Sequence, residues 1–350
     1  MSSKKTLFIT HLAIGDFLYM QPYFKKLTEK LSFLKIDLCV DESRGKSSFW
    51  FNFFKKPQQS NAVVEWAKKS NIFDIVYHVT SNPKSKKEFL QKAAAENYIQ
   101  VISFGCLRPW VYNDYTEKIS KSAFKAGIRS NEEKYDRNLN MFLKDSLPNC
   151  HITDLYGFWF ERLFNFKLKD EEKLPQIEID KKIETSVLAK HPQMKNRSSV
   201  FINAFASNKK RSWPMENVAS LISELKKIPK FANQNFIVNI PPQEVENFEN
   251  KKEIYKNENI IFFTAKESFF ELPAMLSLCN LVISVETSTM HLAQALKIPQ
   301  IALMRTKSPE WKPYKLEESK IIFAPKDLHI KSITPQEVLN KIKCTFCQTS

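Results

Sequence analysis

The chain has 350 residues, 43% of them hydrophobic, so it is long enough for two domains and too apolar for a disordered protein. Its five glycines are spread out, the closest pair 22 residues apart, which argues against dinucleotide oxidoreductases, protein kinases and P-loop NTPases, because their phosphate loops need clustered glycines. The net charge of +15 favours anionic partners (nucleic acid, anionic lipid headgroups or phosphorylated small molecules) or else reflects a lysine-rich solvated surface.

The lack of a recognisable membrane span or signal peptide, together with the cysteine usage, favours a cytoplasmic protein. No run of about 18 uncharged apolar residues is present to span a membrane. The N-terminal apolar stretch is interrupted by His11 and Asp16, so we expect no signal peptide. The six cysteines are scattered, which is typical of reduced thiols. Cys344 and Cys347 form a Cys-x-x-Cys pair without a second pair, so unpaired thiols are favoured there over a zinc site.

The first half of the chain alternates short apolar runs with amphipathic segments. The apolar runs predict buried strands at residues 6–12, 35–40, 73–79 and 98–104. The amphipathic segments predict helices at residues 17–31 and 84–97. Residues 107–150 carry many charges, so we expect loops or short helices there. A helix with an aromatic face is expected at 151–166, followed by a charged, proline-containing linker.

The second half repeats this alternation. Strands are predicted at residues 199–205, 235–240, 259–265, 281–286 and 300–304, and helices at 214–227, 269–279 and 289–297. Continuous apolar strands separated by helices indicate parallel sheets covered on both faces. The fold class is therefore α/β, with two doubly wound parallel-sheet domains at residues 1–172 and 173–350.

Ligands of open parallel sheets bind at the carboxyl ends of the strands, and three segments lie there. In the first, residues 11–22, Gly15 permits a tight turn and Asp16 follows at a helix start. A carboxylate at that place is a candidate general base, and it is also the usual residue to cap a helix.

The second segment covers residues 202–218. Ser207, Lys210 and Arg211 lie between a strand and a helix, close to Pro214. Backbone N–H groups at a helix start, with cations beside them, form a phosphate site that needs no glycine. The alternative is a solvated basic turn.

The third segment covers residues 283–304. Glu286 ends a strand, and Thr287, Ser288 and Thr289 open the helix that holds His291. Hydroxyls and free N–H groups at a helix start suit a diphosphate. His291 is either part of that site or a packed, hydrogen-bonded histidine.

Together the three segments resemble glycosyltransferase family 9, the heptosyltransferases that build the inner core of lipopolysaccharide. IGDFLYMQPYFKKL is similar to the family pattern G-D-x-[VL]-x-x-x-P-x-[LF]-x-x-L. AFASNKKRSWPMENVASLISEL resembles a small-residue turn followed by K-x-W-P and a helix. SVETSTMHLAQALKIPQIALMRTKSPEWKPY resembles D-T-G-x-x-H-L-A-x-A-L-x-x-P-x-[VI]-A-L-F-G-x-T-x-P, the most specific of the three.

This resemblance implies a GT-B architecture, in which two Rossmann-like domains face each other across a cleft. The first domain would hold the acceptor and the second the nucleotide sugar, with neither metal nor cofactor. Asp16 matches the position of the general base for an inverting transfer, and Arg211 that of the diphosphate-binding cation, with Lys210 as the alternative. The expected donor site comprises Ser207, Lys210, Arg211, Glu244, Glu286, Thr287, Ser288, Thr289 and His291. Glu244 would hold the ribose.

Two departures from the family pattern concern the donor. Glu286-Thr287-Ser288 replaces Asp-Thr-Gly, which fits a changed donor sugar as well as it fits lost activity. Arg305 and Lys307 fall where the family has a glycine-containing turn, and these cations would strengthen binding of a diphosphate or of a phosphorylated acceptor.

The aromatic cluster at residues 49–54 is flanked by Arg44, Lys46, Lys55 and Lys56. It is either a core element or a contact with an anionic membrane.

The sequence therefore predicts a cytoplasmic glycosyltransferase, peripheral on the inner face of the inner membrane. It would move a heptose from an ADP-linked donor to a lipid-linked saccharide, and it would not bind nucleic acid. The alternatives are another nucleotide sugar, or a degenerate glycosyltransferase that binds saccharide or lipid without turnover.

Overall fold

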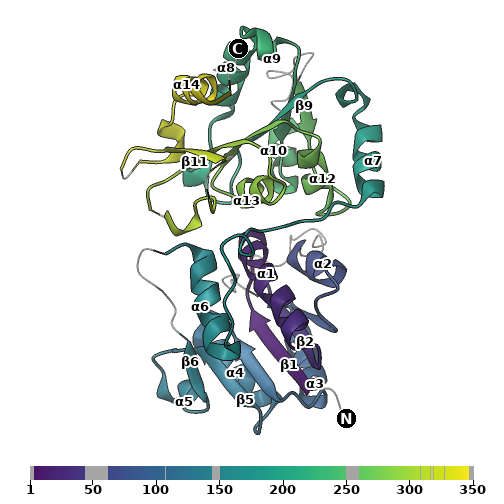
Figure 1. The fold of residues 1–350 in the computed structure, drawn as a ribbon, viewed down its shortest axis with the longest axis vertical. Helices are drawn as coiled ribbons and strands as arrows, with labels where there is room; N and C mark the ends of the chain where they lie inside the picture. Colours follow the sequence, from purple (N-terminus) through teal and green to yellow (C-terminus); the bar gives the residue numbers. More distant parts are fainter. Residues whose placement is uncertain are drawn as a thin grey trace. The chain divides into compact units, whose positions relative to one another are not determined.

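A computed structural model describes residues 4–43, 62–106, 108–143, 150–249, 260–307, 309–315, 317, 319–326 and 328–346. The chain divides into two compact units, Met1–Lys173 and Leu174–Ser350. Each unit has its own six-stranded sheet, in which every pair of neighbouring strands is parallel. Two parallel sheets with flanking helices confirm the predicted fold class (Figure 1).

In unit 1 the strand order is β3-β2-β1-β4-β5-β6. The strands are β1 (Lys4–Thr10), β2 (Leu34–Asp41), β3 (Val76–Val79), β4 (Gln100–Ser103), β5 (Phe124–Ile128) and β6 (Met141–Leu143). The helices are α1 (Ile14–Lys30), α2 (Ala62–Lys69), α3 (Pro83–Ala95), α4 (Pro109–Ile119), α5 (Glu133–Asp136) and α6 (Ile152–Phe164). The apolar strands are covered by these helices, so their side chains are buried on both faces of the sheet.

The aromatic face predicted for residues 151–166 packs in the core of unit 1. Helix α6 lies against α1, and its Phe160 contacts Phe8 of the central strand and Phe24 of α1. The ring centroids of Phe8 and Phe24 are 5.0 Å apart in an edge-to-face arrangement, which aromatic rings favour. This cluster packs α1, the helix that begins near Asp16, against the sheet and α6.

The expectation of loops and short helices over residues 107–150 was wrong. This stretch contains strands β5 and β6 as well as helices α4 and α5. A lysine in β5, Lys125, weakened the apolar pattern that predicts a buried strand. Its Nζ bonds Glu117 at 2.9 Å and the carbonyl of Lys121 at 3.0 Å, so the residue is buried with only 4% of it exposed. A buried lysine with such partners costs little.

In unit 2 the strand order is β12-β11-β10-β7-β8-β9. The strands are β7 (Ser199–Asn203), β8 (Asn235–Asn239), β9 (Ile260–Phe263), β10 (Leu281–Val285), β11 (Gln300–Met304) and β12 (Ser319–Phe323). The sequence predicted all of them except β12, whose partly exposed side chains at the edge of the sheet give a weak apolar signal.

The helices of unit 2 cover both faces of this sheet. They are α7 (Lys181–Lys190), α8 (Met215–Lys226), α9 (Pro229–Ala232), α10 (Val245–Glu249), α12 (Glu271–Ser277), α13 (Ser288–Ala295) and α14 (Pro335–Phe346). Figure 1 shows α8 and α14 side by side, and the indole of Trp213 donates to the carbonyl of Ile333 at 2.8 Å next to them. Within the described ranges, no helix is both long and apolar enough to cross a membrane.

Candidate active site

The carboxyl ends of three strands of unit 2 are joined by buried amide side chains. Asn203 ends β7 and Asn239 ends β8, and the Asn239 Nδ2 donates to Asn203 Oδ1 at 2.9 Å. The Nδ2 of Asn203 in turn donates to the hydroxyl of Thr287, beyond β10, at 2.9 Å. Buried polar groups that satisfy one another in this way rigidify a site. The turn after β10 is therefore held by the neighbouring strand β7 and, through Asn203, by β8.

The start of helix α13 faces this network. Thr287 is its N-cap, yet its hydroxyl bonds Asn203 and the carbonyl of Val285 rather than the helix. No side chain among the described residues caps the helix, and the N–H of Met290 donates to the carbonyl of Thr287 at 3.1 Å, so the N–H groups of Ser288 and Thr289 are the donors that can face an anion. Ser288 is half-buried at this turn and Thr289 is buried. Such a helix start attracts an anion.

His291 lies one turn further along α13. The residue is buried, and its ring lies 6.0 Å from that of Trp311. The structure thus packs His291 close to the predicted diphosphate turn, and its role in the site stays a prediction.

Arg211 reaches the same edge from the short 3-10 helix at Lys209–Arg211. Its Nη2 donates to the Ser207 hydroxyl at 3.0 Å, and its Nη1 lies 3.4 Å from the main-chain oxygen of Glu286. Lys210, the alternative cation, is exposed. Of the two cations that the sequence proposed, Arg211 is the one that the structure brings to Glu286.

Glu286 itself is buried, and Arg305 binds its carboxylate. The Nη2 of Arg305 is 3.0 Å from Oε1, and its main-chain N–H is 3.2 Å from Oε2. The sequence noted Arg305 as a departure from the family pattern that would strengthen binding of a diphosphate or of a phosphorylated acceptor, but it gave no sign of the contact with Glu286. The register of β10 and β11 sets Val285 opposite Leu303, so the two residues that follow these strands meet.

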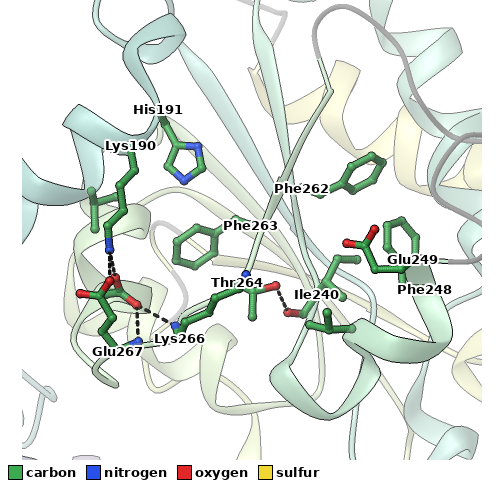
Figure 2. A pocket seen from close by; sticks show the side chains of 13 residues that line it. Lys190, His191, Ile240, Phe248, Glu249, Phe262, Phe263, Thr264, Lys266 and Glu267 are labelled. Atoms are coloured by element: carbon green, nitrogen blue, oxygen red, sulfur yellow. Dashed lines mark hydrogen bonds and ion pairs between the residues drawn. The ribbon is translucent and has the colours of Figure 1, made fainter.

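A cavity of about 330 Å³ opens at the carboxyl ends of β8 and β9, and sequence analysis missed it. Figure 2 shows the rings of Phe262 and Phe263 on opposite sides of β9, as alternation along a strand requires. Lys190 reaches from α7 toward Glu267, with its Nζ at 2.9 Å from that carboxylate. The remaining lining residues come from α7, α10 and the segments that follow β8 and β9: Val187, His191, Ile240, Val245, Phe248, Glu249, Thr264, Lys266 and Glu271.

Two features of the cavity bear on a ligand. Glu244 ends the short 3-10 helix just before α10. Helix α10 supplies Val245 and Phe248 to the cavity lining. Glu244, the residue expected to hold the ribose, therefore directly precedes a lining residue in the chain. Burial, together with the charge of Lys190, lowers the pKa of His191, which keeps that imidazole neutral.

Unit 1 presents Asp16 in the first turn of α1. The main-chain N–H of Ala13 donates to Asp16 Oδ2 at 2.8 Å, and the hydroxyl of Tyr156 donates to Oδ1 at 2.8 Å. The first bond is half of a capping box, so Asp16 does serve the helix start. The second, from α6, fixes the orientation of a half-buried carboxylate.

The same edge of unit 1 holds a second carboxylate and a cation. Arg108, just before α4, donates to the carbonyl of Ser43 at 3.0 Å and to the hydroxyl of Tyr112 at 3.2 Å, and lies 3.5 Å from the buried Asp41. The ring of His11 stacks on Tyr112 with centroids 5.7 Å apart. Sequence analysis missed Arg108, because it lies in the stretch expected to be irregular.

Several expectations concern other residues. Over the part of the chain that the structure describes, no group of three His, Cys, Asp or Glu side chains is arranged to hold a metal ion. The aromatic cluster at 49–54 and its flanking cations, Arg44, Lys46, Lys55 and Lys56, lie outside the described residues, as does Cys347. Cys344 is exposed in α14.

Comparison with protein families gives one match. The family model described as glycosyltransferase family 9 (heptosyltransferase) matches residues 124–341, more than half of the chain. No curated protein sequence matches the chain at a significant level.

Solved structures match over nearly the whole chain. The glycosyl transferase family 9 protein from Veillonella parvula DSM 2008 has a TM-score of 0.79 at 14% identity, with 100% of this chain and 99% of that chain covered. The E. coli ADP-heptose lps heptosyltransferase II has a TM-score of 0.72 at 14% identity, covering 98% and 99%. The E. coli heptosyltransferase WaaC with ADP-2-deoxy-2-fluoro heptose has a TM-score of 0.67 at 18% identity, covering 97% and 99%. At these identities the likeness shows the fold.

Proposed function

The chain belongs to glycosyltransferase family 9, and from that premise we propose that it transfers a heptose from an ADP-linked donor to the inner core of a lipopolysaccharide. It is a glycosyltransferase. The observation that carries the donor half is the cationic edge of unit 2, where Arg211 lies beside the uncapped start of α13. The matching WaaC structure contains an ADP-heptose analogue, which supports the same donor class here.

The diphosphate of the donor binds at this edge in our proposal. The N–H groups of Ser288 and Thr289 and the guanidinium of Arg211 donate to its oxygens, with Ser207 holding Arg211 and Lys210 adding charge from the exposed turn. Fixed donors and a cation stabilise the charge that develops on the leaving diphosphate, so the site can act without a metal ion. His291 supports the helix from within, and Glu286 lies beneath the cations.

The nucleoside of the donor occupies the cavity beside β9. Its apolar lining residues Phe263 and Ile240 suit the faces of a purine, and Lys190 and Glu267 add polar groups to the lining. Glu244 accepts hydrogen bonds from the ribose hydroxyls. This placement sets the nucleoside and the diphosphate at the carboxyl ends of strands of one sheet, as in other doubly wound folds.

Asp16 is the general base on the acceptor, which unit 1 holds. The acceptor hydroxyl gives its proton to the Asp16 carboxylate while its oxygen forms a bond to the anomeric carbon, and the bond from that carbon to the diphosphate breaks on the opposite face. One displacement of this kind inverts the anomeric centre. The bond from Tyr156 orients the carboxylate for that proton transfer.

The acceptor is a lipid-linked saccharide, so we propose that the protein works at the inner face of the inner membrane. The net charge of +15 supports contact with anionic headgroups.

A transfer assay tests the function. Purified protein is incubated with ADP-heptose and lipid-linked inner-core acceptor in the presence of a chelator, and the product is followed by mass spectrometry. We expect acceptor mass to rise by one heptose. Transfer from another nucleotide sugar alone would replace ADP-heptose as the donor and keep the glycosyltransferase activity. Donor binding without any transfer would favour the degenerate, binding-only protein.

A further inference from the structure

Arg305 and Glu286 form an ion pair at the ends of adjacent strands. Arg305 engages both carboxylate oxygens, since its Nη2 lies 3.0 Å from Oε1 while its Nε lies 3.4 Å from Oε2. Its main-chain N–H adds a third contact at 3.2 Å. Only 7% of the Glu286 side chain is exposed. The carboxylate is therefore occupied by groups of the protein itself.

A second cation approaches the same carboxylate. The Nη1 of Arg211 lies 4.0 Å from Oε1 of Glu286 and 3.4 Å from its main-chain oxygen. Two guanidinium groups thus lie within 4.0 Å of one buried carboxylate, and the three side chains together keep a net charge of +1. Donor-sugar hydroxyls would have to displace an arginine to reach this carboxylate, which makes Glu286 a poor sugar ligand.

The geometry of the guanidinium group decides what these three side chains bind. A guanidinium has five N–H groups in a planar fork, and Arg305 directs two of them at Glu286. The three other N–H groups are not used on Glu286. The Arg305 side chain is 20% exposed, and it lies at the carboxyl edge of the sheet, close to where α13 begins. A fork held in one orientation matches two phosphate oxygens at once.

We propose that Arg305 is a second diphosphate-binding residue, and that Glu286 is a positioning residue that holds Arg305 and Arg211 as a pair instead of contacting the sugar. This inference rests on the proposed function and specifies what the donor site recognises: the diphosphate more than the sugar. It also accounts for the joint departure of both residues from the family pattern, because a longer carboxylate and an added arginine serve one another.

The test is calorimetric titration of the full chain with ADP and with AMP, without divalent metal. Arg305→Met removes the cation and the fork but keeps an unbranched apolar side chain. We expect its Kd for ADP to rise by about 10- to 100-fold, the range for charge-assisted hydrogen bonds, and its Kd for AMP to change much less. Lys343→Met, an exposed cation in α14, is the matched control and leaves ADP affinity unchanged.

Glu286→Gln tests the positioning role by its sign. Loss of a negative charge close to two guanidinium groups would by itself strengthen phosphate binding. If Glu286 instead fixes both cations, the variant binds ADP several-fold more weakly, and it loses as much affinity for ADP as for ADP-heptose. Tighter ADP binding, or a loss seen with ADP-heptose only, overturns the positioning role.

Folding is controlled with the double variant. Arg305→Met leaves a buried carboxylate with weaker pairing and can lower stability, whereas Glu286→Gln with Arg305→Met removes both charges. We expect the double variant to melt near the wild type and still bind ADP about tenfold or more weakly. Wild-type affinity for ADP in the double variant would overturn the role of Arg305 alone. If the wild type binds none of ADP, UDP and GDP, the donor assignment fails together with this inference.

Discussion

The two sheets have the same connectivity and opposite chemistry at their carboxyl edges. When the strands of each unit are numbered 1 to 6 along the chain, both sheets have the strand order 3-2-1-4-5-6. In unit 1 that edge presents carboxylates held by tyrosine and arginine, with Asp16 bonded to Tyr156. In unit 2 it presents arginines on a buried glutamate and an uncapped helix. In our proposal one backbone plan therefore serves proton transfer in one unit and anion binding in the other, and the residues that follow the strands set that difference.

Among the variants that separate the two edges, we expect Asp16→Asn to have the largest effect on the transfer rate. Asparagine keeps an oxygen for the N–H of Ala13 but cannot take a proton, so we expect the transfer rate to fall by about 100- to 10,000-fold. Initial rates with saturating ADP-heptose measure the effect. Tyr156→Phe is the matched control, since it removes only the orienting bond and should cost far less. A near-normal rate in Asp16→Asn would remove it as the base.

Arg211→Met breaks the anion-binding edge. We expect the KM for the donor to rise by about 10- to 100-fold, since a charge-assisted hydrogen-bond donor is lost. Lys210→Met, its exposed neighbour, should raise the KM much less, and the two variants are compared in the same transfer assay. The opposite ranking would make Lys210 the diphosphate cation.

Asn203→Ala separates scaffolding from chemistry within unit 2. It leaves Asn239 and Thr287 without their buried partner, which we expect to lower the free energy of unfolding by about 1–3 kcal/mol. Denaturant titration measures the loss, with Asn233→Ala, outside the network, as a control. An unchanged unfolding midpoint would show that the network does not hold the turn.

His191 gives the smallest effect. Its folded-state pKa lies below that of the unfolded chain, so the unfolded state binds more protons and stability falls as the pH drops below about 6.5. His191→Gln should reduce this loss, as seen in melting temperatures at pH 8 and pH 5.5. Equal pH dependence in both proteins would show that burial does not hold this imidazole neutral.

Strand periodicity predicted the sheets better than the sites. Long apolar runs such as those of β1 and β7 are unambiguous, whereas Lys125 in β5 and the exposed edge of β12 obscured their strands. The motifs placed Arg211 and Glu286 after neighbouring strands, and in the structure the Nη1 of Arg211 lies 3.4 Å from the main-chain oxygen of Glu286, whereas their role in donor binding stays a prediction.

The partners of those residues were out of reach of the sequence. Tyr156 meets Asp16 from 140 residues away, and Arg305 meets Glu286 only because β10 and β11 are neighbours in register. The cavity beside β9 joins three separate segments in the same way. Such contacts depend on tertiary packing, which local patterns do not encode.

The central claim, that donor binding belongs to the edge of unit 2 and proton transfer to that of unit 1, is tested most directly by titrating ADP into three proteins without divalent metal. These are the wild type, Asp16→Asn and Arg211→Met. The account predicts equal affinity for the first two and an affinity about 10- to 100-fold lower for the third. Loss of ADP binding in Asp16→Asn, or unchanged binding in Arg211→Met, would contradict it.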